Sequence, residues 1–66
     1  MGKTYKAPVV GKAFAVLDVL ARRDEGLGLS ELAAATGLGK STALGILSAL
    51  EEVRAVERDP TTRRYV

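Results

Sequence analysis

The sequence predicts a mainly α fold in which three helices are followed by a small β-hairpin. Residues 29–50, LSELAAATGLGKSTALGILSAL, read as two short helices joined by a tight, glycine-bearing turn. An apolar pattern with helical spacing precedes them from Val9. Two short runs around Asp59 and Pro60 follow them. The order helix, short strand, helix, turn, helix, hairpin is that of a winged helix-turn-helix.

The first helix is expected to begin at Val9, after a polar, flexible N-terminal arm of residues 1–8 that ends in Pro8. Arg22 and Arg23 fall in its last turn, where cations suit the helix dipole, and Gly26 supplies the positive φ that commonly ends a helix. The expected core-facing stripe consists of Val10, Phe14, Leu17, Leu20 and Ala21, widened by Val16 and Val19.

The second helix is short and rich in alanine, the best helix former. Ser30 is its expected N-cap, because the hydroxyl can accept a hydrogen bond from a free backbone N–H at the helix start. Glu31 adds a favourable charge to the first turn, and Gly37 ends the helix after Thr36. Residues 27–29 could form a very short strand before it.

The third helix is expected over about residues 40–53 and has two different faces. Its inner face is large and apolar, with Ala43, Ile46, Leu47, Leu50 and Val53. Its outer face is small and polar, with Ser41, Gly45, Ser48 and Glu52. Leu44 lies at the border, either as a half-exposed residue at the core edge, which we favour, or as a contact to a thymine methyl group. Gly45 destabilises a helix by about 1 kcal/mol relative to Ala, unless close approach matters there.

The C-terminal runs, residues 55–58 and 63–66, are expected to form a β-hairpin around an Asp-Pro turn. Val56 and Tyr65 would pack inward while the arginines point outward. A two-stranded hairpin is marginal alone, so it must lean on the helices. The residues expected to serve the core only are Leu17, Leu20, Leu32, Leu47, Leu50, Val56 and Tyr65.

Composition narrows the function classes. The chain has 66 residues, no cysteine and no histidine. It therefore makes one small domain without the side chains of zinc sites, thiol catalysis or imidazole general-base chemistry. The acids are scattered, and no candidate nucleophile has a base beside it at a readable spacing. We expect neither a metal nor a cofactor, and we do not expect an enzyme.

The formal net charge is +2, and the positive charge collects at the two ends of the chain. Lysines dominate residues 1–12 and arginines dominate residues 58–66, as expected if both ends touch phosphate. A solvated surface with a charged tail would look the same. Residues 9–20 are too short and interrupted to span a bilayer, which takes about 20 apolar residues. With no signal-peptide pattern either, the protein is expected to be soluble and cytoplasmic.

One stretch of the sequence partly resembles a nucleotide-binding motif. Residues 34–42, AATGLGKST, nearly match the phosphate-binding loop G-x-x-x-x-G-K-[ST]. Ala34 occupies the position of the first glycine, and an alanine-rich helix precedes the motif where that loop requires a buried strand. The chain is also too small for a nucleotide-binding α/β domain, so nucleotide binding is rejected.

Three segments together resemble the N-terminal DNA-binding domain of IclR-type bacterial transcriptional regulators: GKAFAVLDVL, LGLSELAAATGLGKSTALGILSALE and VERDPTTRRYV. The resemblance covers nearly the whole chain from Val10, and its Arg-Asp-Pro-x-Thr-x-Arg-Tyr ending is the most specific part. It implies a homodimeric repressor or activator that binds an inverted-repeat operator in double-stranded DNA. It also implies an effector domain for a small molecule, which is absent from this chain.

The resemblance assigns residues to the DNA contact. It places Lys40, Ser41 and Thr42 at the front of the recognition helix, against phosphates and base edges. Arg63 and Arg64 would sit in the wing and reach the backbone or the minor groove. The remaining candidates are Lys12 on the first helix, Ser30 as the residue that fixes the second helix, and Gly45 and Ser48 on the recognition helix.

The sequence departs from the family's pattern at three positions. Gly45 stands where the family usually has an arginine, which could pair bidentately with guanine, and Leu44 stands where it often has a polar or aromatic residue. Arg54 stands where it usually has a glycine. A non-glycine residue in a left-handed conformation would cost about 1 kcal/mol or more there. The departures put strong base readout in doubt and leave phosphate binding intact.

A second function class stays open from the sequence. Winged helices also serve as protein–protein interaction modules, and the helix face around Gly45 is small and uncharged enough to seat a partner protein. Salt dependence separates the two classes, because phosphate binding weakens steeply with salt whereas apolar docking does not.

Overall fold

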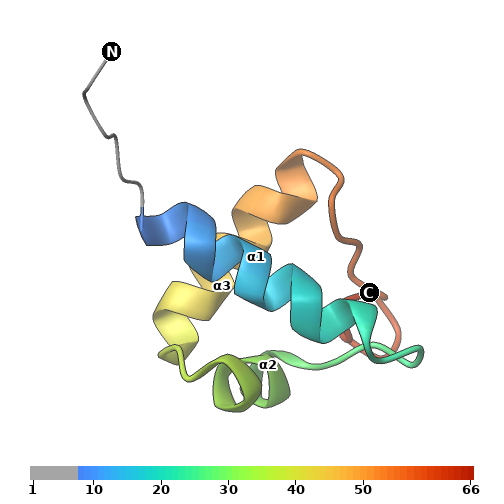
Figure 1. Cartoon of the computed structure of the whole chain (residues 1–66). Helices are drawn as coiled ribbons and strands as arrows, with labels where there is room; N and C mark the ends of the chain where they lie inside the picture. The colour runs from blue at the N-terminus through green and yellow to red at the C-terminus, as the bar shows by residue number, and fades with distance from the viewer. Residues whose placement is uncertain (1–7) are drawn as a thin grey trace, which may run out of the picture.

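The computed structural model describes residues 8–66, which form three helices followed by a C-terminal loop (Figure 1). The helices are α1 (Pro8–Ala21), α2 (Leu29–Thr36) and α3 (Lys40–Glu52). The expected arm lies outside the described residues except for Pro8, which is the first residue of α1. The mainly α fold is as the sequence predicts. None of the helices is long and apolar enough to cross a membrane.

The three helices pack against one another in every pairing, around a single core. That core draws on all three helices, on the α1–α2 loop and on the C-terminal segment. Its buried members are Val16, Leu20, Leu27, Leu32, Ile46, Leu47, Val56 and Tyr65. Leu32, Leu47 and Val16 are the largest fully buried side chains. Leu17 and Leu50, also predicted as core residues, pack against this cluster while only partly buried.

The apolar stripe predicted for α1 is partly wrong. Val16 and Leu20 are its buried residues, whereas Val10, Phe14 and Ala21 are exposed. Successive residues of a helix point about 100° apart, and the face against α2 and α3 is centred between Ala13 and Leu20 instead of on Phe14. The helix also ends at Ala21, so Arg22 and Arg23 lie beyond it, in a turn where their N–H groups donate to the carbonyls of Val19 and Leu20.

The N-cap predicted for α2 is also wrong. Gly28 is the N-cap, in an extended conformation, and Ser30 is the exposed second residue of the helix. The Gly28 N–H donates to Glu31 Oε1 at 2.9 Å, and the Gly28 carbonyl accepts the first helical bond from Leu32 at 3.0 Å. The helix begins early because the extended segment before it ends at Leu27, which is the residue that pairs with Tyr65.

The turn between α2 and α3 follows the prediction. Gly37 ends α2 with φ +75°, in the left-handed region that glycine adopts without strain. α3 then begins at Lys40 and ends at Glu52. Ala43, Ile46 and Leu47 are buried as predicted. Val53, expected on the inner face, is 72% exposed because the helix stops before it.

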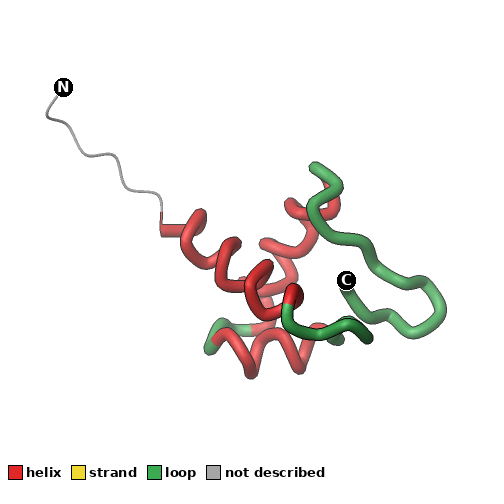
Figure 2. Tube along the Cα trace, turned by 45° about the vertical axis from the view of Figure 1, so that its right-hand side comes forward, coloured by secondary structure: helices red, strands yellow, loops and turns green. Residues whose placement is uncertain are grey.

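The segment after α3 returns as a long loop that projects from the helical body (Figure 2). Backbone hydrogen bonds join Glu57 to Val66 and Asp59 to Arg64, in the pattern of a hairpin. Only Arg58 and Tyr65 form a β-bridge within it, so no part of it qualifies as a strand among the described residues. The predicted two-stranded β-hairpin is therefore not shown. Residues 57–66 form an irregular loop with hairpin-like hydrogen bonds, which we call the wing.

The wing is attached to the α1–α2 loop. Leu27 and Tyr65 exchange two backbone hydrogen bonds, of 3.0 and 2.7 Å. Gly26 has φ +78°, and a Cβ on it would lie 2.7 Å from the Tyr65 carbonyl oxygen and 2.7 Å from Val66 Cγ1. Glycine is required here mainly because the wing passes so close. Val56 and Tyr65 are buried, as predicted.

Candidate nucleic-acid interface

The first turns of α3 present an open surface. Lys40, Ser41 and Thr42 are all exposed, and Gly45 and Ser48 continue the exposed face along the helix. Ala43, Ile46 and Leu47 are buried on the opposite side of α3. α3 is thus held by its inner face while its outer face is free to meet a ligand.

Because Gly45 has no side chain, the backbone of α3 is exposed on this outer face. A Cβ built on Gly45 meets no atom within 4 Å, so no packing inside the domain requires a glycine there. Leu44 beside it is 45% exposed and is not a member of the buried core cluster. Nor is it among the partly buried residues that pack against that cluster, so the core-edge position favoured from the sequence is not supported, and the apolar side chain is accessible to a ligand.

Arg63 is held at the tip of the wing by a network of local bonds. Asp59 Oδ1 accepts hydrogen bonds from the backbone N–H groups of Thr61 at 2.8 Å and Thr62 at 3.4 Å. The Arg63 N–H donates to the Asp59 carbonyl at 2.7 Å, and Arg63 has φ +63°. Its side chain is exposed. The turn therefore presents this cation outward on a constrained backbone.

Arg64 has a different environment from its neighbour. It is half-buried, and its Nη1 donates to the Gly26 carbonyl at 3.3 Å. The guanidinium therefore joins the wing to the α1–α2 loop instead of extending into solvent. Arg64 holds the wing in position and is a less suitable direct contact to DNA than Arg63.

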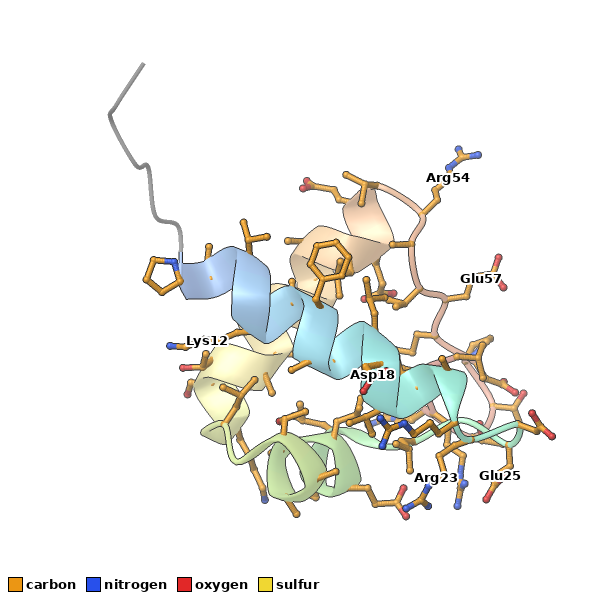
Figure 3. All side chains as sticks on the ribbon, viewed as in Figure 1. Lys12, Asp18, Arg23, Glu25, Arg54 and Glu57 are labelled. Atoms are coloured by element: carbon orange, nitrogen blue, oxygen red, sulfur yellow. The ribbon has the colours of Figure 1, made fainter. Side chains whose placement is uncertain are left out.

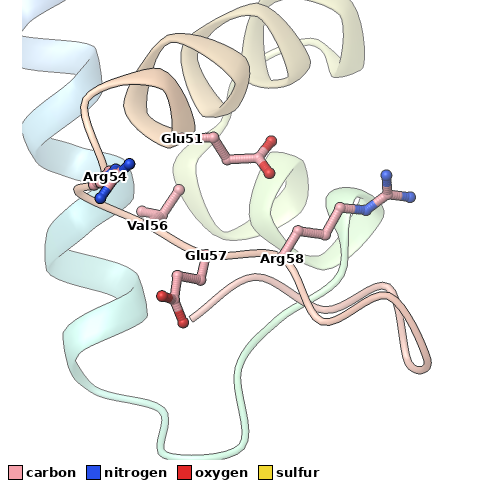
Figure 4. Close-up of a pocket in the computed structure, with 5 residues that line it drawn as sticks. All are labelled: Glu51, Arg54, Val56, Glu57 and Arg58. Carbon is pink, nitrogen blue, oxygen red and sulfur yellow. The ribbon is translucent and has the colours of Figure 1, made fainter.

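Arg58 is a candidate contact that the sequence analysis missed. It lines a hollow between the start of α2 and the wing, together with Ser30, Thr62 and Arg63. The side chains of Arg58 and Glu57 project on opposite sides of the chain (Figure 4). Glu31, whose Oε1 accepts from the Gly28 N–H, also lines the hollow. The Arg58 guanidinium carbon lies 5.8 Å from the centre of the Tyr65 ring, a cation–π distance. The signal that could have identified Arg58 is the alternation of side chains along the extended residues 56–58, which places Glu57 and Arg58 on opposite sides.

The predicted site residues do not all gather in one place. Lys40, Ser41, Thr42, Gly45 and Ser48 share the exposed face of α3, while Ser30 and Arg63 share the hollow with Arg58. Lys12 projects from the first half of α1, at the other end of that helix from Asp18 (Figure 3). It is exposed and is not among the residues that line the hollow.

The cations of these surfaces are not neutralised within the domain. Across residues 8–66, the one ion pair joins Arg22 to Asp18 at 2.8 Å, on the exposed face of α1. Nor do acidic side chains gather anywhere in those residues in a group that could hold a metal ion. The arrangement suits binding to an anionic surface, since Lys40, Arg58 and Arg63 are all exposed.

A third surface is apolar, and we call it the α1–α3 groove. It lies between the start of α1 and the end of α3 and is lined almost entirely by apolar atoms. Its lining residues are Val9, Val10, Ala13, Ile46, Ala49, Leu50 and Val53. Phe14, which is 64% exposed, also lies on α1. This side of α3 is distinct from the face that carries Ser41, Gly45 and Ser48.

Known proteins share both the sequence pattern and this fold. Residues 9–60 match the model of the IclR helix-turn-helix domain. The glycerol operon regulatory proteins of Streptomyces griseus and Streptomyces coelicolor are each 44% identical to the chain over 54 residues, covering 82% of the chain and 21% of each relative. The chain thus spans about a fifth of the length of these relatives.

The crystal structure of the IclR transcriptional regulator from Alicyclobacillus acidocaldarius has the same fold, with a TM-score of 0.80 and 38% sequence identity. The match covers 92% of the chain and 25% of that regulator. The predicted family is therefore confirmed: the chain belongs to the IclR family of transcriptional regulators and carries that family's DNA-binding helix-turn-helix domain.

Proposed function

We propose that residues 9–66 bind an operator in duplex DNA with α3 in the major groove and the wing on the sugar-phosphate backbone. The observation that carries the proposal is the exposed, polar front of α3, held in place by a buried inner face. A helix of this size fits the major groove of B-DNA, and the second helix of a helix-turn-helix is the one that enters it.

Lys40, Ser41 and Thr42 are the proposed contacts at the front of α3, to phosphates and base edges. All are exposed, and no ion pair of the described residues involves Lys40. Ser48 extends the contact by nearly two further turns of α3, since it lies six residues after Thr42. Lys12 is a further proposed contact to phosphate, since it is an exposed cation in the first half of α1.

Ser30, Arg58 and Arg63 are proposed to hold one backbone phosphate in the hollow between α2 and the wing. The support is their common lining of that hollow, whose volume is about 430 Å³. Two guanidinium groups and a hydroxyl supply donors of the type that phosphate oxygens accept. Arg64 acts through the wing in this proposal, by bonding to Gly26.

Lys40→Ala is expected to weaken binding to all DNA sequences and to lower the slope of log affinity against log salt by about 1, because one phosphate contact is lost. The measurement is fluorescence anisotropy with a labelled duplex at several salt concentrations. Lys40→Arg is the control, since it keeps the charge and should keep the slope. An unchanged slope in Lys40→Ala would remove Lys40 from the contacts.

We further propose that two copies of the domain bind one operator, an inverted repeat, and that the α1–α3 groove is where they meet. A two-fold pair needs a self-complementary surface. The groove offers an apolar one, with Val10 exposed in its lining and Phe14 exposed on the same helix, α1. Covering the groove leaves the outer face of α3 free. Half-sites would then lie about 34–36 Å apart or a multiple of that distance.

Val10→Asp is expected to turn a dimer into a monomer, because it places a charge in the apolar groove. Light scattering after size exclusion, with and without an inverted-repeat duplex, measures the change. Val66→Asp is the matched control for the oligomeric state of the free chain, since Val66 is 51% exposed, much like Val10 at 49%, and lies outside the groove. It is not used with the duplex, because Val66 belongs to the wing. A wild-type chain that stays monomeric on the duplex would contradict the dimer.

The remaining parts of the proposal concern the whole protein. We infer that the domain works in the cytoplasm, by binding and not by catalysis. We also infer that a longer protein adds a domain for a small-molecule effector and represses or activates an operon. The support is that the chain spans about a fifth of each relative, and that those relatives are named operon regulatory proteins.

A further inference from the structure

The outer face of α3 has few groups that can distinguish bases by hydrogen bonds. Residues 41–49 contain no arginine, lysine, asparagine, glutamine or acid. Those are the side chains that make bidentate or donor-specific contacts to base edges, whereas a serine or threonine hydroxyl can both donate and accept. Hydrogen bonds from this part of α3 therefore carry little sequence information.

The same face does carry one large apolar side chain. Leu44 is 45% exposed, three residues after Ser41 and next to Gly45. Residues three and four apart lie on one side of a helix, so Leu44 borders the stripe of Ser41, Gly45 and Ser48. The empty space at Gly45, where a Cβ would meet nothing, lets a groove floor come close to the backbone beside Leu44.

The thymine C5-methyl group is the one apolar group that the base pairs present in the major groove. We propose that Leu44 reads thymine methyl groups, with Gly45 permitting the close approach, so that this helix selects A·T pairs by apolar contact. The inference rests on the proposed binding of α3 in the major groove, and it names the base feature that α3 recognises there.

The expected size follows from the burial of one methyl group. Removing about one methylene equivalent from water contributes about a fourfold change in affinity. Each thymine methyl under Leu44 should therefore strengthen binding by about that factor, without changing the number of phosphates contacted and so without changing the salt slope.

The test compares duplexes that differ only in that methyl group. An alternating adenine–thymine duplex is compared with an alternating adenine–uracil duplex, which keeps every hydrogen-bonding group of the groove. An alternating guanine–cytosine duplex is compared with its 5-methylcytosine counterpart, which gains a methyl group at the same place. The 66-residue chain should prefer the methylated member of each pair, by about fourfold per contacted methyl group.

Protein variants assign the preference to Leu44. Leu44→Ala should bring both affinity ratios close to one, and Leu44→Met should largely retain them because it remains long and apolar. Val53→Ala is the control, since Val53 is an exposed apolar residue that follows α3 but lies outside the stripe. Because Val53 lines the α1–α3 groove, this variant is judged only by the ratio of its affinities for the methylated and unmethylated duplexes, in which a general change in binding cancels.

The outcomes separate this inference from the proposed function. Equal affinity for thymine and uracil duplexes, or a preference that survives Leu44→Ala, overturns the reading of methyl groups while salt-sensitive DNA binding stands. Absence of salt-sensitive binding to all four duplexes overturns both.

Discussion

Leu47→Ala is expected to lower the free energy of unfolding by about 3 kcal/mol, the largest effect of any substitution considered. Leu47 is completely buried and lies on the inner face of α3, within the cluster that joins all three helices. A truncated side chain loses its transfer free energy and leaves a cavity. A domain of this size has only about 3–5 kcal/mol from its core, so the variant should be partly unfolded.

Urea unfolding followed by circular dichroism measures this effect. Leu44→Ala is the matched control, because it makes the same chemical change three residues away at a side chain that is 45% exposed. It should reduce stability by about 1 kcal/mol or less. Similar midpoints for the two variants would mean that α3 is not anchored by the face described above.

Gly26→Ala is expected to lower the free energy of unfolding by about 2–3 kcal/mol. Two causes combine at this position: a left-handed φ of +78°, and a new Cβ only 2.7 Å from the Tyr65 carbonyl oxygen. Of the two atoms at this distance, Val66 Cγ1 can rotate away, but the Tyr65 carbonyl oxygen belongs to the backbone and cannot. The α1–α2 loop and the wing must therefore separate, which would weaken the pairing of Leu27 with Tyr65.

Gly37→Ala isolates the first cause, the left-handed φ, because Gly37 has φ +75° but no atom within 4 Å of a built Cβ. It should cost about 1 kcal/mol, the strain of the left-handed backbone alone. Thermal unfolding of both variants gives the comparison. Equal losses would show that the close approach of the wing contributes nothing beyond backbone conformation.

Gly26→Ala also has a functional consequence. The Gly26 carbonyl accepts a hydrogen bond from the Arg64 side chain. Displacement of the α1–α2 loop therefore breaks this bond as well as the backbone pairing of Leu27 with Tyr65. We expect Arg63 and Arg58 to lose their fixed relation to α2, and DNA affinity to fall even where the variant is still folded. Gly37→Ala should leave the wing in place.

The helices could be predicted from the sequence because their signals are local. Gly37, the pattern of α3 and the exposure of Ser41, Gly45 and Ser48 all follow from spacing and glycine chemistry over a few residues. The left-handed φ of +64° at Arg54 follows from the family resemblance, which placed a glycine there. Local signals also placed Val56 and Tyr65 in the core.

The predictions were wrong where contacts between distant parts of the chain determine the local structure. Gly28 and not Ser30 caps α2, because the pairing of Leu27 with Tyr65 fixes where the extended segment ends. Phe14 fits the helical stripe of α1, yet the way α2 and α3 dock leaves it exposed. The sequence pointed to Arg64 as a contact to DNA and passed over Arg58 for the same reason. Only the return of the wing against α2 shows that Arg64 bonds to Gly26 while Arg58 lines the hollow.

The most direct test of the account is selection from a pool of random DNA duplexes at several salt concentrations, followed by sequencing of the bound fraction. The account predicts salt-sensitive binding and enrichment of an inverted repeat, with A·T pairs where α3 contacts the groove. Absence of binding even at low salt would contradict it, and would indicate that the exposed face of α3 binds a partner protein instead of DNA.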